Sequence, residues 1–340
     1  MLTHQFLGDY KKYGLCCYIK IASAHLRGWS YNDWVISDVN KTNCRTYLST
    51  LQYCLMHPFN AEYSSWIDDK LTLKYILAGT AAGKYMPDYY YQISAKGRIE
   101  PLMDCPGRLK SKGAEGIIEL LKAKQDLALK LIKGSLGKGF YHICMSDGDI
   151  SVNGQVMDDC RFTAFINSLR GYIVTQYLKP HSSIARYNNR TPGCLRYILG
   201  RKKNGEWTNV YTFMRIGTVA SGNVENFNAG GVLMEIDRHG GYDGGLVLAN
   251  GGVRPVAVDM HPDSDAPLKG VIPMWNEVKE AARKVVAVMP QLTYAGFDFC
   301  ITDNSEVKII EINSLTSLDC MQTRRSILDY PGGQFFRELL

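Results

Sequence analysis

Apolar and polar residues alternate along several short segments of the chain, and these segments turn through residue pairs that favour tight hairpins. Two such pairs are Asp147-Gly148 and Asn204-Gly205, each flanked by runs of apolar residues. This arrangement is a strong short-range indication of two antiparallel strands. With a third, glycine-rich turn, the pattern predicts β-hairpins over residues 140–155, 195–215 and 232–249.

Other segments carry apolar residues at helical spacing. The spacing predicts amphipathic helices over residues 66–77, where Asp68 would cap the first turn, and over residues 114–124, 160–170 and 274–289. The first sixty residues are rich in Tyr, Trp and Cys, and we expect them to be helical and packed against the rest. Helices interspersed among hairpins indicate an α+β fold with antiparallel sheets rather than a doubly wound parallel sheet.

Composition excludes several classes of protein. A length of 340 residues predicts two or three subdomains. The net charge of +6 suits anionic ligands but is too small to indicate a nucleic-acid-binding protein. Apolar runs are too short to span a bilayer, and the first ten residues lack the core of a signal peptide. The ten cysteines are scattered, which predicts reduced thiols in a cytoplasmic protein.

The stretch GFDFCITDNSEVKIIEINS, residues 296–314, gathers three polar side chains on an otherwise apolar hairpin. If Asn304 and Ser305 form a two-residue turn, Asp298 lies directly opposite Glu311, and Asn313 shares their face. Two opposed carboxylates repel each other, and a divalent cation removes that cost. Mg²⁺ prefers such oxygen ligands, with nucleotide phosphates completing its coordination.

The alternative for this hairpin is a solvent-exposed face with ordinary polar side chains. If the same two-residue turn forms, the alternation of side chains along the strand places Val307 and Ile309 on the same face as Asp298. These apolar neighbours disfavour a fully solvated surface, so we expect a metal site.

A glycine-rich loop, LIKGSLGKGFYHI, follows the apolar segment 127–134 that we expect to be a strand. Its glycines would let backbone N–H groups approach a phosphate, and Lys133 would end the preceding strand. The loop lacks the G-K-[ST] of a Walker motif, and the chain lacks the kinase motifs H-R-D and D-F-G. A simple turn is the alternative. Arg196, alone in an apolar strand, predicts either an ion pair or an anion ligand.

Taken together, a lysine before a glycine loop and a later D-x12-E-x-N hairpin resemble the ATP-grasp superfamily. Three further segments are similar to its sugar-transfer-associated branch, which includes the teichuronopeptide-synthesis type. They are KPHSSIARYNNRTPGCLRYIL, ENFNAGGVLMEIDRHGG and HPDSDAPLKGVIPMWNEV. The resemblance extends from about Asp68 to Asn313.

This resemblance implies an ATP-grasp fold, in which two α+β subdomains clasp ATP. Residues 66–175 would be the nucleotide-lid subdomain and residues 176–340 the metal-binding and catalytic subdomain. Residues 1–65 depart from the α/β domain that usually precedes them, and we expect a divergent helical segment.

The resemblance also implies roles for individual residues. Asp298, Glu311 and Asn313 would hold two Mg²⁺ ions under the ATP phosphates. Arg196 and Lys133 would act in catalysis, Arg196 by neutralising the transferred phosphate and Lys133 by binding nucleotide. The other nucleotide-binding positions would be Lys70, Gly134, Ser135, Gly137, Lys138, Gly139, the hinge residues Gln176, Tyr177, Leu178 and Lys179, and Asn228.

The implied activity is that of an ATP- and Mg²⁺-dependent carboxylate–amine ligase that forms a C–N bond through an acyl phosphate. The substrates would be ATP, a carboxylate-bearing glycan or sugar, and an amine. The product would be an amide, such as an amino acid joined to a uronic acid, in the biosynthesis of a capsule or other cell-surface polysaccharide. A peptide ligase or kinase using the same site, and a nonenzymatic nucleotide-binding protein, remain the alternatives.

Overall fold

The computed structural model describes residues 2–110, 112–134, 137, 139–222, 224–248 and 254–340, and over these the chain divides into two compact units. Unit 1 comprises residues 1–68 and 180–340, and unit 2 is the intervening segment Asp69–Lys179. The sequence places subdomain boundaries after residues 65 and 175, whereas the chain passes between the units after Asp68 and after Lys179. No helix in the described ranges is long and apolar enough to cross a membrane.

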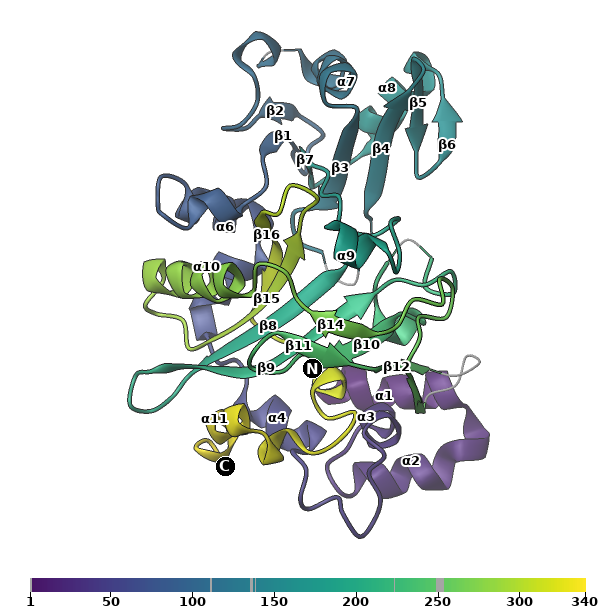
Figure 1. The fold of residues 1–340 in the computed structure, drawn as a ribbon, viewed down its shortest axis with the longest axis vertical. Coiled ribbons are helices and arrows are strands. Elements are labelled where there is room, and N and C mark those ends of the chain that lie inside the picture. Colours follow the sequence, from purple (N-terminus) through teal and green to yellow (C-terminus); the bar gives the residue numbers. More distant parts are fainter. Residues whose placement is uncertain (1, 111, 135–136, 138, 223, 249–253) are drawn as a thin grey trace. The chain divides into compact units, whose positions relative to one another are not determined.

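Unit 2 is built on a seven-stranded antiparallel sheet with the strand order β2-β1-β7-β3-β4-β5-β6 (Figure 1). Its strands are β1 (Tyr89–Ile93), β2 (Ile99–Pro101), β3 (Asp126–Leu131), β4 (Tyr141–Ser146), β5 (Asp149–Val152), β6 (Gln155–Met157) and β7 (Tyr172–Gln176). Its helices are α6 (Lys70–Leu77), α7 (Gly113–Lys124) and α8 (Asp159–Ser168), with 3₁₀ turns η3 (Gly83–Tyr85) and η4 (Gly107–Leu109).

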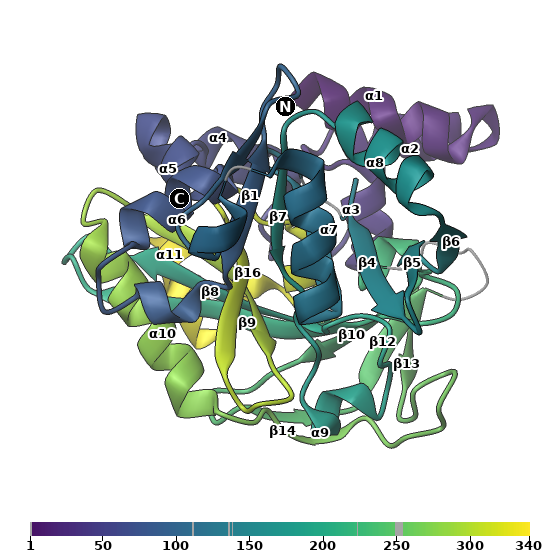
Figure 2. The same cartoon turned by 90° about the horizontal axis from the view of Figure 1, so that it is seen from above.

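Alternation along the strands of unit 2 decides which face of the sheet is covered. Leu127 and Leu129 of β3 point into a core with Val174 of β7, and α7 and α8 close that core from one side (Figure 2). The intervening residues, among them Asp126 and Lys130, therefore belong to the opposite face of the sheet. That second face carries Asp126 and Lys130 together with the buried residues Ala128 and Ile173.

Unit 1 is built on a second seven-stranded antiparallel sheet, ordered β13-β12-β10-β9-β8-β15-β16, and a two-stranded sheet, β11-β14. The strands are β8 (Cys194–Arg201), β9 (Trp207–Ile216), β10 (Val232–Glu235), β11 (Gly241–Asp243), β12 (Gly245–Leu248), β13 (Pro255–Val258), β14 (Lys269–Val271), β15 (Tyr294–Ile301) and β16 (Val307–Asn313). The α-helices are α1 (Leu2–Tyr13), α2 (Tyr18–His25), α3 (Tyr31–Ile36), α4 (Thr50–Met56), α5 (Ser65–Asp68), α9 (Ser182–Ala185), α10 (Trp275–Val288) and α11 (Gln334–Arg337). The 3₁₀ turns are η1 (Leu15–Cys17), η2 (Ala61–Ser64), η5 (Phe227–Ala229), η7 (Asp319–Met321), η8 (Ile327–Asp329) and η9 (Pro331–Gly333).

The N-terminal segment is helical, as expected, and it is part of the core of unit 1. Leu48 and Tyr53 lie in one cluster of buried side chains with Phe213 of β9, Tyr294 of β15 and Phe336 near the C-terminus. The Leu48 backbone also exchanges two hydrogen bonds with the Gln322 side chain, at 3.3 and 2.9 Å. The α+β fold class with antiparallel sheets is confirmed.

The helix expected over residues 66–77 is wrong in one respect, because the chain forms two helices there. Asp69, rather than Asp68, caps α6, since its Oδ1 accepts from the Thr72 N–H at 2.8 Å. Asp68 instead accepts from the N–H and the hydroxyl of Ser314, at 2.8 and 2.6 Å, directly after β16. The carboxylate of Asp68 therefore fixes the end of the hairpin that carries Asn313.

Candidate active site

The hairpin β15–β16 places Asp298 opposite Glu311, as expected, but its turn and its register differ from those expected. The turn is one residue longer, because the Thr302 N–H bonds the Glu306 carbonyl at 2.8 Å and Ser305 adopts a left-handed φ of 58°. A β-bulge after Asp298 compensates for that extra residue. The bulge restores the pairing of the two carboxylates.

The same bulge reverses the faces of two apolar residues. Val307 pairs with Ile301 and Ile309 pairs with Phe299, so both belong to the core face of the sheet. The expectation that they share a face with Asp298 is wrong, because the register shift moves them by one residue. The face of Asp298 carries Glu311 and Asn313 without these neighbours.

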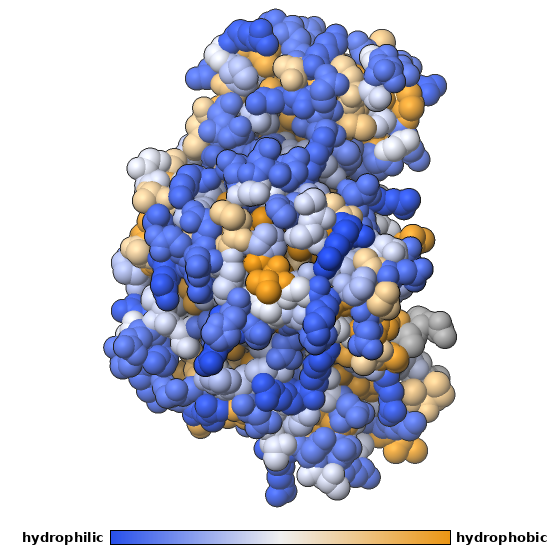
Figure 3. All heavy atoms as spheres, viewed as in Figure 1, coloured by the Kyte–Doolittle hydropathy of each residue, from blue (hydrophilic) through white to orange (hydrophobic). Residues whose placement is uncertain are grey.

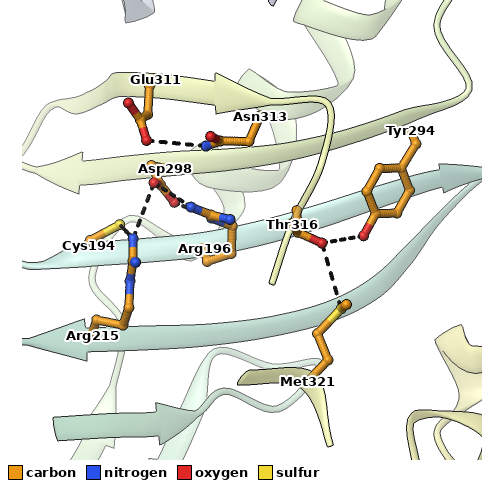
Figure 4. A network of polar contacts seen from close by, with 9 residues as sticks. All are labelled: Cys194, Arg196, Arg215, Tyr294, Asp298, Glu311, Asn313, Thr316 and Met321. Atoms are coloured by element: carbon orange, nitrogen blue, oxygen red, sulfur yellow. Dashed lines mark hydrogen bonds and ion pairs between the residues drawn. The ribbon is translucent and has the colours of Figure 1, made fainter. Parts of the chain in front are cut away.

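Asp298 has two cationic partners. It lies opposite Arg196 of β8, whose Nε and Nη2 both donate to its carboxylate, the latter at 2.7 Å. The Nη2 of Arg215, on β9, donates to the same carboxylate at 3.2 Å. Figure 4 shows the three side chains converging from three neighbouring strands. The arginines therefore offset the repulsion expected between Asp298 and Glu311.

The environment of these groups keeps all three charged. Asp298 is only 2% exposed, and burial by itself would raise the pKa of its carboxyl. The charges of Arg196 and Arg215 outweigh burial and lower that pKa to about 2. The pKa of Arg215 is raised well above its usual value, since the charges of Cys194 and Asp298 oppose the effect of its burial. Two guanidinium groups share the Asp298 carboxylate, and Glu311 on the same face brings the charge of the cluster into balance.

Arg215 was not among the residues that the sequence argument singled out. Its Nη2 also donates to the Cys194 thiol at 2.8 Å, and its buried Nε has no hydrogen-bond partner among the described residues. An unsatisfied buried donor on a cation is costly, and an anionic ligand would satisfy it. The signal was available, because Arg215 interrupts an apolar strand, YTFMRI, just as Arg196 interrupts its own.

The donor set on β16 fits a magnesium ion in its chemistry. Glu311 and Asn313 lie two residues apart on one face, and the Asn313 Nδ2 lies 3.3 Å from the Glu311 Oε1. A carboxylate and an amide oxygen are hard ligands of the kind that Mg²⁺ takes together with phosphate oxygens. Asp298 lies next to them on β15 but is shared with two arginines. We therefore expect Glu311 and Asn313 to be the main protein ligands.

Asn228, expected to bind the nucleotide, is paired with a buried carboxylate. Its Nδ2 donates to the Asp319 Oδ2 at 2.9 Å, from η5 to η7. Burial raises the pKa of the neighbouring Cys320 thiol, and the charges of Arg215 and Arg196 act on that thiol in the opposite direction. Asn228 is therefore engaged with η7, and Cys320 of the same turn senses the charges of the two arginines.

In unit 2, Lys133 does not lie on a strand, and the expectation that it ends one is wrong. Strand β3 stops at Leu131, and the Lys133 side chain is 77% exposed, with its Nζ 3.7 Å from the Asp69 carboxylate. Lys130 is the lysine that β3 carries, opposite Ile173 of β7. The strand-borne lysine is therefore Lys130, three residues earlier than expected.

Lys70, expected as a nucleotide-binding residue, contacts the start of the glycine loop. Its side chain is buried, its Nζ donates to the Gly134 carbonyl at 2.8 Å, and its N–H donates to the Ile132 carbonyl. Gly137 and Gly139 adopt φ values of 70° and 68°, which favour glycine. Ser135 and Lys138, the other expected loop residues, lie outside the described residues.

The expected hinge, Gln176 to Lys179, is held by polar contacts. The N–H of Gln176 donates to the Asp88 carbonyl at 2.9 Å, so it is already engaged. The Tyr177 ring stacks on His142 at 3.8 Å, and the Lys179 Nζ lies 2.7 Å from the Asp126 carboxylate. Leu178 is buried. Because the Gln176 N–H is already bonded, we expect the segment Tyr177 to Lys179, rather than Gln176, to contact adenine.

A second group of possible metal ligands lies in this network. The ligand atoms of Asp126, His142 and Cys144 lie within 4.8 Å of one another. The Asp126 carboxylate, however, already accepts from His142 at 2.8 Å and pairs with the Lys179 ammonium. A cation so close disfavours a metal ion, and we interpret the group as support for the hinge.

Comparison with known proteins identifies the chain's relatives. The family model described as sugar-transfer associated ATP-grasp matches residues 54–329. No curated protein matches the sequence significantly. Similar solved structures include a Staphylococcus aureus N5-carboxyaminoimidazole synthetase complexed with ADP, with a TM-score of 0.42 and 13% identity over 76% of this chain and 48% of that chain.

Two further structures are similar at the same level. A carboxyaminoimidazole ribonucleotide synthase from Aspergillus clavatus, complexed with ATP, has a TM-score of 0.42 and 13% identity over 78% of this chain and 52% of that chain. The ATP-grasp ligase PsnB, complexed with its minimal precursor, has a TM-score of 0.41 and 11% identity over 83% of this chain and 63% of that chain. The chain thus spans about half the length of the synthetases, at 48% and 52%.

Proposed function

Because the chain belongs to the sugar-transfer associated ATP-grasp family, we propose that it is an ATP- and Mg²⁺-dependent carboxylate–amine ligase. The observation that carries the proposal is the cluster of Arg196 and Arg215 around Asp298, beside Glu311 and Asn313. It combines two guanidinium groups, an unsatisfied buried donor on one of them, and hard oxygen ligands. Such a set suits a triphosphate and its cation.

The proposed reaction has two steps. A carboxylate oxygen of the acceptor attacks the γ-phosphorus of ATP, the bond from that phosphorus to the bridging oxygen breaks, and ADP leaves. The amine nitrogen then attacks the carbonyl carbon of the acyl phosphate, inorganic phosphate leaves, and the amine loses a proton to solvent. Neither step needs a protein nucleophile, because positioning and charge neutralisation supply the catalysis.

The residues of this chain have distinct proposed tasks. Arg196 and Arg215 neutralise the transferred phosphoryl group, and Asp298 orients both guanidinium groups. Glu311 and Asn313 would hold Mg²⁺, which supplies charge neutralisation between phosphate oxygens when bound.

The nucleotide contacts are proposed for unit 2. Lys130 takes the place first assigned to Lys133 as the phosphate-binding lysine of the strand. Lys70 and the glycine loop form one further group of contacts, and Tyr177 to Lys179 contact adenine.

The acceptor is proposed to be a glycan or sugar carboxylate, such as a uronic acid, and the product an amide in a cell-surface polysaccharide. Support for the glycan comes from the family description, sugar-transfer associated. A cytoplasmic location is proposed too, and the free thiol state of all ten cysteines supports a reducing compartment.

The test is an ATP assay with trapping. Purified protein is incubated with ATP, Mg²⁺, hydroxylamine and a panel of uronic acids and uronate oligosaccharides. We expect ADP release that depends on both Mg²⁺ and a carboxylate, with a hydroxamate formed in equal amount, because hydroxylamine captures an acyl phosphate. Arg215→Met should lower both products by at least ~100-fold.

Two of the alternatives predict other results. A kinase would release ADP and phosphorylate a hydroxyl, with no hydroxamate for any carboxylate tested. A nonenzymatic protein would bind ATP and release no ADP under any condition. Either outcome would contradict the ligase proposal.

A further inference from the structure

The N-terminal helices expose large apolar side chains that the proposed ligase chemistry does not use. Leu26 is 88% exposed and Ile19 is 82% exposed, and they are the most exposed of the large apolar residues in the described ranges. On the same N-terminal helices, Leu55, Leu7 and Tyr18 are 70%, 64% and 55% exposed. An exposed leucine alone is ordinary, but a group of them indicates an interaction surface.

Ile19 and Leu26 lie on one side of their helix, and the helix that carries Leu55 begins beside its end. Ile19 and Leu26 are seven residues apart, two turns of α2, and so they point to the same side, whereas Ile21 and Ala24 face inward. The Leu51 N–H donates to the Gly28 carbonyl at 2.8 Å, which places the first turn of α4 beside the end of α2. Leu55 follows Leu51 by one turn.

The surface is held rigidly on unit 1. The Asp9 carboxylate, on α1, accepts from the N–H groups of Tyr31 and Asn32 at the start of α3, at 2.6 and 3.1 Å, and pairs with His25 of α2 at 2.8 Å. Trp29, directly after α2, is fully buried. The helices are therefore fixed while their apolar side chains remain exposed.

The exposed charges of this N-terminal segment are mostly positive. Among residues 6–57 whose side chains are described, the exposed basic residues are Lys11, Lys12, Lys20, Arg27, Lys41 and Arg45, and the exposed acidic residue is Asp38. Lys20 adjoins Ile19, and Arg27 adjoins Leu26. Figure 3 shows hydrophobic residues among hydrophilic ones at the lower right, where Figure 1 places α2. Apolar side chains interleaved with lysine and arginine are typical of helices that lie on anionic membranes.

We propose that α1, α2 and the first turns of α4 form a docking surface for an anionic lipid bilayer. Ile19, Leu26 and Leu55 enter the boundary between headgroups and acyl chains, and the flanking Lys and Arg side chains contact acidic headgroups. The predominance of basic over acidic side chains favours an anionic bilayer over a second copy of the chain, because two copies would bring like charges together. This docking does not depend on the proposed ligase activity.

The experiment is co-sedimentation of the full chain with lipid vesicles. We expect binding to phosphatidylcholine vesicles containing about 30% phosphatidylglycerol, and little binding to pure phosphatidylcholine. Binding should weaken from about 0.05 to about 0.5 M NaCl, because salt screens the headgroup charge. The double variant Ile19→Glu/Leu26→Glu should bind at least ~10-fold more weakly.

A matched control separates the surface from a general effect of added charge. Val156→Glu changes another solvent-exposed apolar residue, 66% exposed, in unit 2, and this variant should bind vesicles as the wild type does. Circular dichroism checks that every variant is folded, which the high exposure of the changed residues favours. Equal binding to neutral vesicles, no binding to anionic ones, or unchanged binding of the double variant would overturn the proposal. A dimer that the double variant abolishes, without vesicle binding by the wild type, would assign the surface to a second copy.

Discussion

At the scale of single residues, Asp298 is the group on which the candidate site depends. It joins Arg196 and Arg215 within the sheet, and its neighbour across the other ladder is Glu311. Removing one partner of a buried ion pair leaves uncompensated charge, which costs more than the pair contributes. Asp298 and Glu311 therefore differ in role, although they face each other.

Conservative variants separate the two roles. Asp298→Asn should lower the free energy of unfolding by about 3 kcal/mol or more, because two buried guanidinium groups lose their counter-charge. Glu311→Gln should leave stability nearly unchanged and lower ADP release by at least ~100-fold. Thermal unfolding and the ATP assay measure the two effects. Equal destabilisation by both variants would contradict this division.

A second residue-scale prediction concerns Asp33 of α3. Burial, and then the charge of Asp319, raise the pKa of the Asp33 carboxyl to about 7, from 3.8. The folded protein thus retains a proton that the unfolded chain releases between these two values. Stability should fall as pH rises from about 4 to about 7, and it should be constant above that range.

Asp33→Asn tests this dependence. The amide removes the titration, and its oxygen can still accept from the Thr50 hydroxyl, which lies 2.6 Å from the carboxylate. We expect the variant to gain at least about 3 °C in Tm over the wild type at pH 8 and much less at pH 5. A parallel shift of both proteins across the pH range would contradict the assignment. Asp38→Asn, an exposed change on the same segment, is the control.

At the scale of elements, the ends of strands decide which side chains meet. Strand β3 stops at Leu131, so that Lys130 lies on the sheet while Lys133 extends toward solvent. On the β15–β16 hairpin, a turn that is one residue longer shifts the register, and the bulge after Asp298 shifts it back, so that Asp298 still pairs with Glu311. Apolar spacing along the chain records neither the end of a strand nor the length of a turn.

The two lysines give a direct test of this boundary. Lys130→Ala should weaken ATP binding by at least ~10-fold, because a cation on the sheet is rigidly placed for a phosphate. Lys133→Ala should weaken it by less than ~3-fold, as expected for an exposed charge. Titration calorimetry with a nonhydrolysable ATP analogue measures both. The reverse order would restore Lys133 to the role that the sequence argument assigned it.

At the scale of the whole molecule, the chain leaves unit 1 after Asp68 and returns to it after Lys179. Residues from the first and last parts of the sequence share one core, as Tyr53 and Phe336 do. Unit 2 has a separate core, which includes Leu127, Leu129 and Val174. The N-terminal helices are therefore a structural part of unit 1.

Deletion distinguishes the two units. Removing residues 1–57 takes Ile36, Leu48 and Tyr53 out of the core of unit 1, and we expect the remaining chain to lose cooperative unfolding. A fragment of residues 69–179 should instead unfold cooperatively, since its core is self-contained. Calorimetry of both pieces checks the prediction. A truncated chain that still unfolds in one sharp transition would show that the N-terminal helices are dispensable.

The sequence by itself determined what depends on neighbours along the chain. Alternation and turn residues predicted the hairpins, helical spacing predicted α7 and α10, and the hairpin motif located Asp298, Glu311 and Asn313. Only the tertiary structure decided that Asp298 joins Arg196 to Arg215, that Lys130 is the strand lysine, and that residues 1–68 belong to unit 1. Pairing of strands and burial of helices join residues far apart in sequence, and local periodicity carries no information about such partners.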